Sequence, residues 1–307
     1  MLNLNKVNVV TLTYNHEKYI AKCINSIVEQ DTDAEVEILV GNDCSTDCTK
    51  DILEKIEIAP DNFSMKVFNH SQNLGVAQNF CKLMEEVTGE YIVFLDGDDF
   101  MLPGKLSTQL DILKKNPEVN LVHHNVCEVN EDGVVTKQRR IKKGVAGSIN
   151  DIFKACQSGI QSCSIVVRNP YIKDWSVIVP KDSKIVDLPF LLHSLGKGKV
   201  FYLNDVLSAY RVIDSSITRT TSVLTFEKNT RFHVRQTIDF GYAKRSFINT
   251  SLAASYIRSA SAEIVNKKLK LASIYVWRAL RLLPYPSNEL LRTLLNLIKV
   301  VIKSAKS

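Results

Sequence analysis

The sequence predicts an α/β fold in which a mostly parallel sheet is covered by helices, and two observations lead to this prediction. Runs rich in β-branched and aromatic residues alternate with runs whose apolar residues recur at helical spacing, from the N-terminus to about residue 129. Such alternation is typical of βαβ units, whose strands lie parallel. With 307 residues, 45% hydrophobic and 23% charged, the chain can also bury a full core without disulfides or a metal ion.

The first half of the sheet is predicted from residues 7 to 95. The expected strands are residues 7–13, 35–40, 65–68 and 91–95, and the expected helices are residues 17–29, 45–57 and 76–86. Ser45 and Thr46 can cap the second of these helices.

The pattern continues beyond residue 95 with one interruption. A helix is expected at 103–115, with Pro103 in its first turn, and a strand at 121–129. Glu131-Asp132-Gly133 and the basic run from Lys137 to Lys143 then predict a hairpin or a mobile loop. A helix at 185–195 and a strand at 200–203 follow. Gly196-Lys197-Gly198-Lys199 between them lacks phosphate-loop spacing and indicates a helix stop and a turn.

The last part of the chain differs in charge from the rest. Residues 226–307 are helical in pattern until Pro284 and Pro286, and they contain 15 Lys or Arg and 4 Asp or Glu, a net charge of +11. Because the whole chain carries +6, residues 1–225 carry −5. We therefore expect an α/β domain over 1–225 and a basic helical extension over 226–307. A mildly acidic body argues against nucleic acid as a partner, whereas the extension suits an anionic membrane surface or an acidic protein.

The extension ends in a segment that is amphipathic on a helical wheel. Apolar residues fall in one arc, namely Leu290, Leu291, Leu294, Leu295, Leu297, Ile298, Val301, Ile302 and Ala305, and cationic residues lie opposite, namely Arg292, Lys299, Lys303 and Lys306. Residues 287–307 are thus expected either to lie on an anionic membrane or to pack against residues 246–283 or a second subunit in a homo-oligomer.

The sequence also predicts the compartment. It has no signal-peptide pattern at its N-terminus and no run of 18 apolar residues, so we expect a cytoplasmic protein, either free or peripheral on the inner face of the cell membrane. The seven cysteines lack the spacing of a zinc site and the density of a secreted scaffold, which predicts reduced packing residues.

The densest cluster of acidic residues follows the strand at 91–95. Asp96, Asp98 and Asp99 are three carboxylates in four residues, and such neighbours repel one another unless a cation lies between them. Oxygen ligands favour Mg²⁺ or Mn²⁺. The alternative is a solvated Asp-Gly turn that closes the strand.

Two more polar clusters follow predicted strands, Thr13-Tyr14-Asn15 after the first and Asn42-Asp43 after the second. In parallel sheets, ligands bind outside the carboxyl ends of the strands, so the three clusters predict one shared pocket. Taken singly, Tyr14 could be a core aromatic residue and Asp43 a turn residue.

Five segments together resemble glycosyltransferase family 2 in order and spacing across residues 5–217. They are VNVVTLTYNHEKYIAKCINSIVEQ, EILVGNDCSTDCT, NLGVAQNF, YIVFLDGDDFMLPGKL and IVDLPFLLHSLGKGKVFYLNDVLSAYRV. The resemblance implies the GT-A fold, a Rossmann-like mostly parallel sheet flanked by helices, here with a helical C-terminal extension. It also implies transfer of a sugar from a nucleotide diphosphate donor to an acceptor hydroxyl, with inversion at the anomeric carbon.

The resemblance implies a donor-binding role for the strand-end residues. Thr13, Tyr14 and Asn15 match the motif that lines the base pocket, with Tyr14 placed to stack on the base, and Asp43 matches the acid that accepts a hydrogen bond from a uracil or thymine ring NH. The loop and helix start beside the nucleotide are matched by Asn73, Gly75 and Asn79.

The same resemblance implies the catalytic and metal residues. Asp96 and Asp98 match the DxD pair, with Asp98 as direct metal ligand, Asp96 nearer the ribose and metal shell, and Asp99 as an adjacent candidate. Asp187 matches the catalytic base, although alone it could be a helix N-terminal acid. Arg211 lies in a Tyr-Arg motif near the diphosphate side of the pocket.

The sequence departs from the family pattern at three positions. Asn42 replaces a common Asp, and Gln78 stands where an Arg often precedes the Asn. The Tyr-Arg motif is often followed by a metal-binding His, but Ile213 near that position cannot bind a metal. Either Asp214, water or the donor diphosphate completes the shell, or the metal is bound more weakly.

The expected function is therefore an inverting glycosyltransferase that depends on Mn²⁺ or Mg²⁺. It would use a nucleotide diphosphate sugar, with UDP as the expected nucleotide, and act on a cell-surface polysaccharide or lipid-linked oligosaccharide. Nucleotidyl transfer to a sugar phosphate is the first alternative, but it predicts a Gly-rich, Lys-containing loop after the first strand, which Thr13-Tyr14-Asn15-His16 is not. A non-catalytic assembly subunit with a relict donor pocket is the second.

Overall fold

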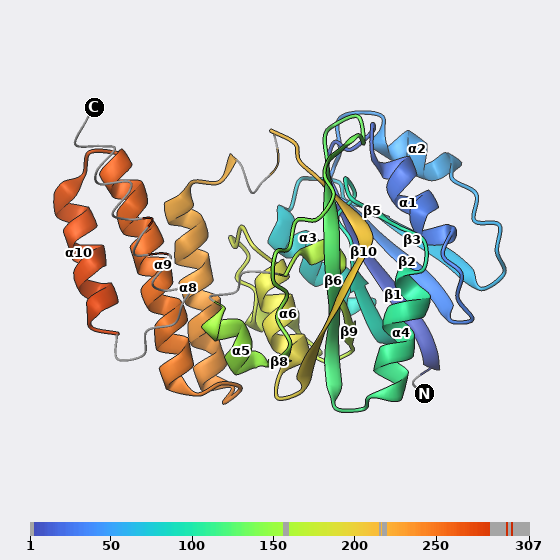
Figure 1. The fold of residues 1–307 in the computed structure, drawn as a ribbon. Coiled ribbons are helices and arrows are strands. Elements are labelled where there is room, and N and C mark those ends of the chain that lie inside the picture. The colour runs from blue at the N-terminus through green and yellow to red at the C-terminus, as the bar shows by residue number, and fades with distance from the viewer. Residues whose placement is uncertain are drawn as a thin grey trace.

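A computed structural model describes residues 3–155, 160–214, 216, 220–282, 293 and 296 of the chain (Figure 1). The strands are β1 (Asn3–Thr13), β2 (Glu35–Asn42), β3 (Phe63–Asn69), β4 (Gly89–Phe94), β5 (Phe100–Met101), β6 (Val119–Val129), β7 (Val135–Lys137), β8 (Gly147–Ser148), β9 (Val166–Arg168) and β10 (Lys199–Arg211). The helices are α1 (Ile20–Val28), α2 (Thr49–Lys55), α3 (Val76–Glu85), α4 (Lys105–Lys115), α5 (Ile149–Lys154), α6 (Asp187–Leu195), α8 (Val223–Asp239), α9 (Arg245–Val265) and α10 (Leu269–Leu280), with short 3-10 turns η1 (Ser162–Ser164) and η2 (Trp175–Val177).

The strands form one sheet in the order β3-β2-β1-β4-β9-β6-β10-β5, and β7 and β8 pair at its side with β6 and β10. Strands β3, β2, β1 and β4 are parallel to one another, and so are β6 and β10. The short strand β9 is antiparallel to both of its neighbours, β4 and β6. The predicted α/β fold with a mostly parallel sheet is confirmed, and the antiparallel β9 separates its two parallel parts.

Helices cover both faces of the sheet, so its central strands are apolar on both sides. In β1, Val7 and Val9 pack with the cluster formed by α1, α2 and α4, whereas Val10 and Leu12 pack with the cluster formed by α3, α6 and α8. Figure 1 shows the first group on the opposite side of the sheet from α3 and α6. The near-continuous apolar runs of the sequence follow from this double burial.

Several predicted elements have different bounds in the structure, and β10 and α2 show a physical reason for the difference. Strand β10 extends to Arg211 rather than ending at residue 203, because a register shift between Leu203 and Val206 lets the strand continue through polar residues. Helix α2 begins at Thr49, because Ser45 and Thr46 bind the loop after β1 instead of capping a helix. The predicted hairpin is present, since β7 pairs antiparallel with β6.

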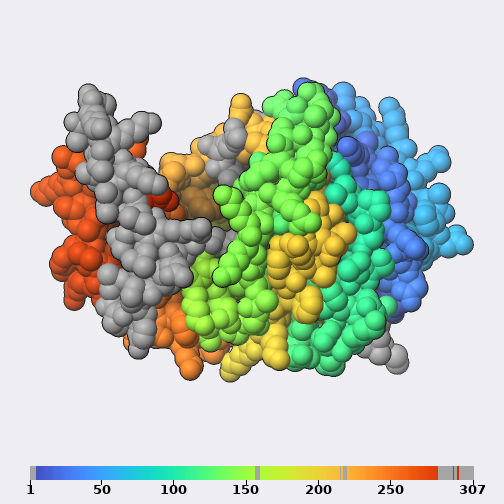
Figure 2. Space-filling view, viewed as in Figure 1, coloured from blue at the N-terminus to red at the C-terminus, as the bar shows by residue number. Residues whose placement is uncertain are grey.

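Helices α8, α9 and α10 follow the sheet and form its helical extension, as Figure 1 shows at the red end of the chain. Small residues allow close packing between α9 and α10, where Ala253, Ala260, Ala272 and Ala279 are buried. In the space-filling view the extension lies at one end of the molecule and the first strands and helices at the other (Figure 2). The division into domains 1–225 and 226–307 stays a prediction.

The predicted amphipathic helix over 287–307 lies outside the described residues, apart from residues 293 and 296, and is not tested. Among the helices that the structure describes, none is long and apolar enough to cross a membrane. The cysteines described are unpaired, as expected, and Cys23, Cys81, Cys127 and Cys163 are buried.

Candidate functional site

The three polar clusters meet at one edge of the sheet, where β1, β2 and β4 end. Thr13 at the end of β1 is in register with Asn42 at the end of β2. The backbone N–H of Gly97 donates to the carbonyl of Leu12 over 2.9 Å. A Cβ atom on Gly97 would lie 2.9 Å from Thr13 Oγ1, so the acidic loop is pressed against the first strand. The three clusters therefore adjoin at the edge predicted from the sequence, and a shared pocket there stays a prediction.

Asp43 is buried at the end of β2 and holds the loop before α3. Its carboxylate accepts hydrogen bonds from the backbone N–H groups of Leu74 at 2.7 Å and Gly75 at 2.9 Å, and Asn73 Nδ2 donates to the Asp43 carbonyl at 3.1 Å. Because each carboxylate oxygen has two lone pairs, Asp43 can still accept a further N–H. The structure thus brings Asp43 and the Asn73 loop together.

Asn79 lies one turn into α3 with its amide turned into the protein. Its Nδ2 donates to the Gly41 carbonyl at 2.8 Å, and its Oδ1 lies 3.0 Å from His70 Nε2. A Cβ atom at Gly41 would come within 2.0 Å of Asn79 Oδ1, so this packing requires glycine at position 41. Asn79 therefore positions α3 on the end of β2, and contact between its amide and a donor stays a prediction.

Tyr14 and Asn15 form the loop after β1. Asn15 adopts a left-handed φ of 56°, and its Oδ1 accepts from the Thr46 N–H at 2.8 Å. Its own N–H donates to Ser45 Oγ at 3.0 Å. These bonds fix the loop and leave the Tyr14 ring 45% exposed. Tyr14 directly follows Thr13, whose carbonyl accepts from the Asp43 N–H at 3.0 Å, and an exposed aromatic side chain there is a suitable surface for a stacked base.

The acidic loop holds more negative charge than its surroundings neutralise. Burial, followed by the charges of Asp98 and Asp187, raises the pKa of Asp96 well above its usual value. Burial, followed by Asp98 and Asp96, does the same to the pKa of Asp99, whose Oδ2 has no hydrogen-bond partner. Carboxylates in such a group are stabilised by a cation.

The loop meets the needs of Mg²⁺ or Mn²⁺ only in part. Within the described ranges, no group of three His, Cys, Asp or Glu residues is arranged to hold a metal ion. Mg²⁺ commonly binds one or two carboxylates together with substrate phosphates, however, and Asp96 and Asp98 provide such a pair. These two carboxylates suit an ion that binds together with a diphosphate.

Arg211 lies beside the acidic loop, and the hydrogen bonds of its guanidinium go to backbone carbonyls. Its Nε donates to the Asp98 carbonyl at 2.8 Å, and its Nη1 donates to the carbonyls of Asn130 at 2.9 Å and Glu131 at 2.6 Å. The guanidinium carbon lies 4.6 Å from the centre of the Tyr19 ring, and the side chain is buried. Arg211 thus clamps the acidic loop to the β6–β7 hairpin, and its predicted role toward a diphosphate is not tested.

Asp187 is the first residue of α6, and burial raises the pKa of its carboxyl group. The Leu188 N–H donates to its Oδ1 at 2.9 Å. Because the Asp187 charge also raises the pKa of Asp96, the two carboxylates are close enough to interact. A carboxylate with a raised pKa near the acidic loop suits proton removal from a hydroxyl.

Two neighbours of the loop were not singled out in the sequence. His16 packs against Gly97, and burial lowers its pKa and leaves its Nδ1 without a partner. Ser162 in η1 donates to Asp96 Oδ2 at 3.4 Å. His16 directly follows the Thr13-Tyr14-Asn15 motif and could have been noticed, whereas Ser162 carries no sequence signal.

Behind the loop, β6 and α4 enclose a buried amine. Lys105 Nζ donates to Gln109 Oε1 at 2.7 Å and lies 3.2 Å from His124 Nε2. Burial lowers the pKa of Lys105 to about 7. His123 and His124 are buried in β6.

Comparison with known proteins gives one family and several relatives. The model of the family described as glycosyl transferase family 2 matches residues 8–169. An uncharacterised protein of Mycobacterium tuberculosis is 31% identical over 208 residues, which cover 67% of this chain and 58% of that protein. TuaG of Bacillus subtilis, assigned to teichuronic acid biosynthesis as a glycosyltransferase, is 27% identical over 225 residues, which cover 69% of this chain and 81% of TuaG. The chain spans less than two-thirds of the length of the mycobacterial relative.

Solved structures match over almost the whole chain. Staphylococcus aureus TarS, residues 1–349 in complex with UDP-GlcNAc, matches with a TM-score of 0.70 at 21% identity, over 97% of this chain and 89% of that one. The mannosyltransferase PcManGT from Pyrobaculum calidifontis, in complex with GDP-Man and Mn²⁺, matches with a TM-score of 0.61 at 17% identity, over 97% and 85%. These matches confirm the predicted GT-A fold.

Proposed function

Because the chain belongs to glycosyl transferase family 2, we propose that it transfers a sugar from a nucleotide diphosphate sugar to a hydroxyl group of a cell-surface glycan. The observation that carries this proposal is the meeting of Tyr14, Asp43 and the Asp96–Asp99 loop at one sheet edge, with the Asp187 carboxylate close enough to interact with Asp96. This arrangement supports a donor site with a base for the acceptor close to it.

The donor is proposed to bind through its base and its diphosphate. Tyr14 stacks on the base, and Asp43 accepts the ring N–H with the acceptor capacity that Leu74 and Gly75 leave open. Uracil and thymine have such an N–H, which supports UDP as the nucleotide. TarS, with a similar fold, has been solved with UDP-GlcNAc and with UDP.

Asp98 and Asp96 are proposed to hold Mn²⁺ or Mg²⁺ together with the donor diphosphate. The unneutralised charge of the loop supports this, and PcManGT was solved with Mn²⁺ and a nucleotide sugar. The ion would stabilise the negative charge that develops on the leaving phosphate. Arg211 keeps the loop in position by binding the Asp98 carbonyl.

Asp187 is proposed as the general base. Its raised pKa makes it a stronger proton acceptor than an exposed aspartate, and general base catalysis is typically worth about 10² to 10⁴ in rate. Attack from the Asp187 side, opposite the leaving diphosphate, would invert the anomeric carbon.

The acceptor is proposed to belong to a cell-surface polysaccharide or lipid-linked oligosaccharide, which is supported by the assignment of TuaG to teichuronic acid biosynthesis. Cytoplasmic location, attachment of residues 287–307 to an anionic membrane, and a homo-oligomer stay predictions from the sequence.

A panel of nucleotide sugars tests the donor and the metal without knowledge of the acceptor. UDP-glucose, UDP-N-acetylglucosamine, a thymidine-linked sugar and GDP-mannose are each incubated with the full chain and Mn²⁺, and released nucleotide is measured. Slow hydrolysis of one UDP-sugar that disappears with a chelator and in Asp98→Ala, but persists in the surface control Asp111→Ala, is expected. Binding of UDP without hydrolysis of any donor would favour the relict-pocket alternative. Nucleotide release that continues at the same rate in the presence of the chelator would refute the metal assignment.

A further inference from the structure

Helix α10 is apolar on the side that faces solvent as well as on the side that faces α9. Ala272 and Ala279 are buried against α9, yet Leu269 and Leu280 are 67% and 56% exposed. Trp277 is 56% exposed. A surface helix normally has a polar outer face, and a helix that is apolar all round is normally covered. The outer face of α10 therefore calls for an apolar partner.

Cationic residues are interleaved with these apolar ones. Lys267, Lys268 and Lys270 surround the start of α10, and Arg278 and Arg281 lie in its last turn. The sequence contains no Asp or Glu between Glu263 and Glu289. The partner must then be both apolar and anionic.

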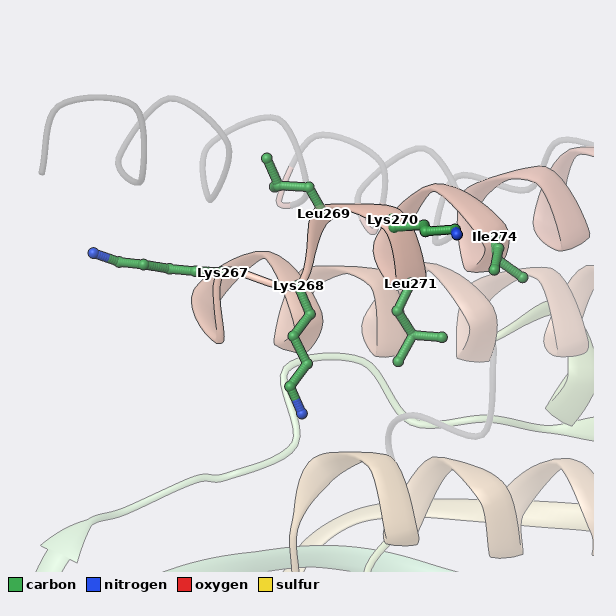
Figure 3. A pocket seen from close by; sticks show the side chains of 6 residues that line it. All are labelled: Lys267, Lys268, Leu269, Lys270, Leu271 and Ile274. Carbon is green, nitrogen blue, oxygen red and sulfur yellow. The ribbon is translucent and has the colours of Figure 1, made fainter.

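The start of α10 is also hollowed. Lys267, Lys268, Leu269, Lys270, Leu271 and Ile274 line a shallow depression of about 510 Å³. Figure 3 shows these six side chains spreading in different directions from the α9–α10 turn and the first turn of α10, with Leu269 on one side and Lys268 and Leu271 on the other. Long lysine side chains beside leucines can reach the headgroup layer of a lipid surface with their charged ends while the leucines lie in the apolar layer.

We infer that the outer face of α10, here called the α10 face and comprising Lys267–Leu271, Ile274, Trp277, Arg278, Leu280 and Arg281, binds the surface of an anionic lipid membrane. Apolar side chains enter the acyl boundary while lysines and arginines contact anionic headgroups. Trp277 lies at the interface, where tryptophan is enriched in membrane proteins. A protein partner is less consistent with the face, because lysine is depleted in the cores of protein–protein interfaces.

The α10 face is separate from the donor site. It is formed by the helical extension, far along the chain from the sheet edge where Asp98 lies. Its substitution leaves the donor site intact, so donor hydrolysis serves as a check that the variants are folded.

Vesicle binding by the full chain tests the inference. Vesicles of phosphatidylcholine alone are compared with vesicles that also contain phosphatidylglycerol, at low salt, by co-sedimentation and by tryptophan fluorescence. Trp175 is buried in the core and gives a constant background, so a blue shift on adding anionic vesicles reports on Trp277. We expect binding and a blue shift only with phosphatidylglycerol, and weaker binding as salt is added.

Two variants and their controls separate charge from apolar insertion. The triple change Lys267→Glu, Lys268→Glu and Lys270→Glu should weaken binding more than about 100-fold, since each cation near an anionic surface contributes about fivefold. Its control changes Lys55, Lys142 and Lys143 to Glu and should bind as wild type. Leu269→Ser with Leu280→Ser should reduce the blue shift, whereas Val177→Ser, which is equally exposed elsewhere, should not.

Three results would overturn the inference. The full chain could stay in the supernatant with anionic vesicles at low salt. The triple variant could bind as tightly as its control. Light scattering could instead show a dimer that dissociates in the Leu269→Ser and Leu280→Ser variant, which would make the α10 face a contact between two copies of the chain.

Discussion

Replacing Arg211 by alanine should destabilise the fold of this protein even when no donor is present. The substitution removes the three hydrogen bonds that join the guanidinium to the carbonyls of Asp98, Asn130 and Glu131, and the contact with the Tyr19 ring. At a net value of about 1 kcal/mol for each bond and about 0.5 to 1 kcal/mol for the ring contact, the loss is about 4 kcal/mol. For 307 residues the unfolding entropy is about 0.6 kcal/mol/K, so the melting temperature should fall by about 6 °C.

Thermal unfolding followed by circular dichroism, without donor or metal, measures this effect. Arg211→Lys should lose most of the same stability, because an ammonium group cannot bind three carbonyls in the fork geometry of a guanidinium. Arg139→Ala is the matched control: Arg139 also donates to a backbone carbonyl, that of Asn204, but it is exposed and should shift the melting temperature by about 1 °C or less. If Arg211→Ala melts like the wild type and loses only UDP affinity, Arg211 is a diphosphate ligand and the clamp is wrong.

Four further substitutions test the site and its surroundings. Asp98→Ala should abolish turnover and the Mn²⁺ dependence of donor binding measured by calorimetry, with an unchanged melting temperature; Asp96→Ala should act similarly but less completely. Asp187→Asn should keep donor affinity and lose about 10² or more in kcat. Because only the carboxylate accepts a proton, kcat/KM of the wild type should rise with pH through an apparent pKa above that of an ordinary aspartate. Near-normal kcat in the Asn variant would exclude Asp187 as the base. Between pH 7 and 10.5, the usual pKa of a lysine, the unfolded state binds more protons at Lys105 than the folded state does. The unfolding free energy should therefore rise with pH in the wild type but not in Lys105→Met. If denaturant titrations gave both proteins the same slope of unfolding free energy against pH, they would contradict the buried neutral amine.

The elements of the sheet could be predicted because they depend on local patterns. Strands such as β1 and β4 are apolar runs that end in polar clusters, and parallel topology places those ends at one edge. The convergence of Thr13, Asp43 and the acidic loop followed from these two facts. The antiparallel β9 could not be foreseen, since three residues carry too little pattern to show a strand.

The contacts of individual side chains could not be predicted, because they join residues far apart in the sequence. Arg211 binds carbonyls about 80 to 113 residues earlier, and backbone carbonyls leave no mark in a sequence. The sequence predicted Asn79 to lie beside the nucleotide, which stays untested, and its amide is engaged by Gly41 and His70. Ser45 and Thr46 have the residue types of a helix cap but bind Asn15 instead.

The clamp made by Arg211 has a consequence for the order of events during synthesis. The acidic loop leaves the ribosome more than 100 residues before Arg211, which lies in the last described strand, β10. The backbone N–H of Arg211 also donates to the Asp99 carboxylate. Until β10 has paired with β6, neither the loop nor the hairpin over it is held in place. A nascent chain that stops short of residue 211 therefore contains every carboxylate of the acidic loop but not the contacts that fix them. The proposed binding of a metal with a nucleotide would then be acquired only as the sheet is completed.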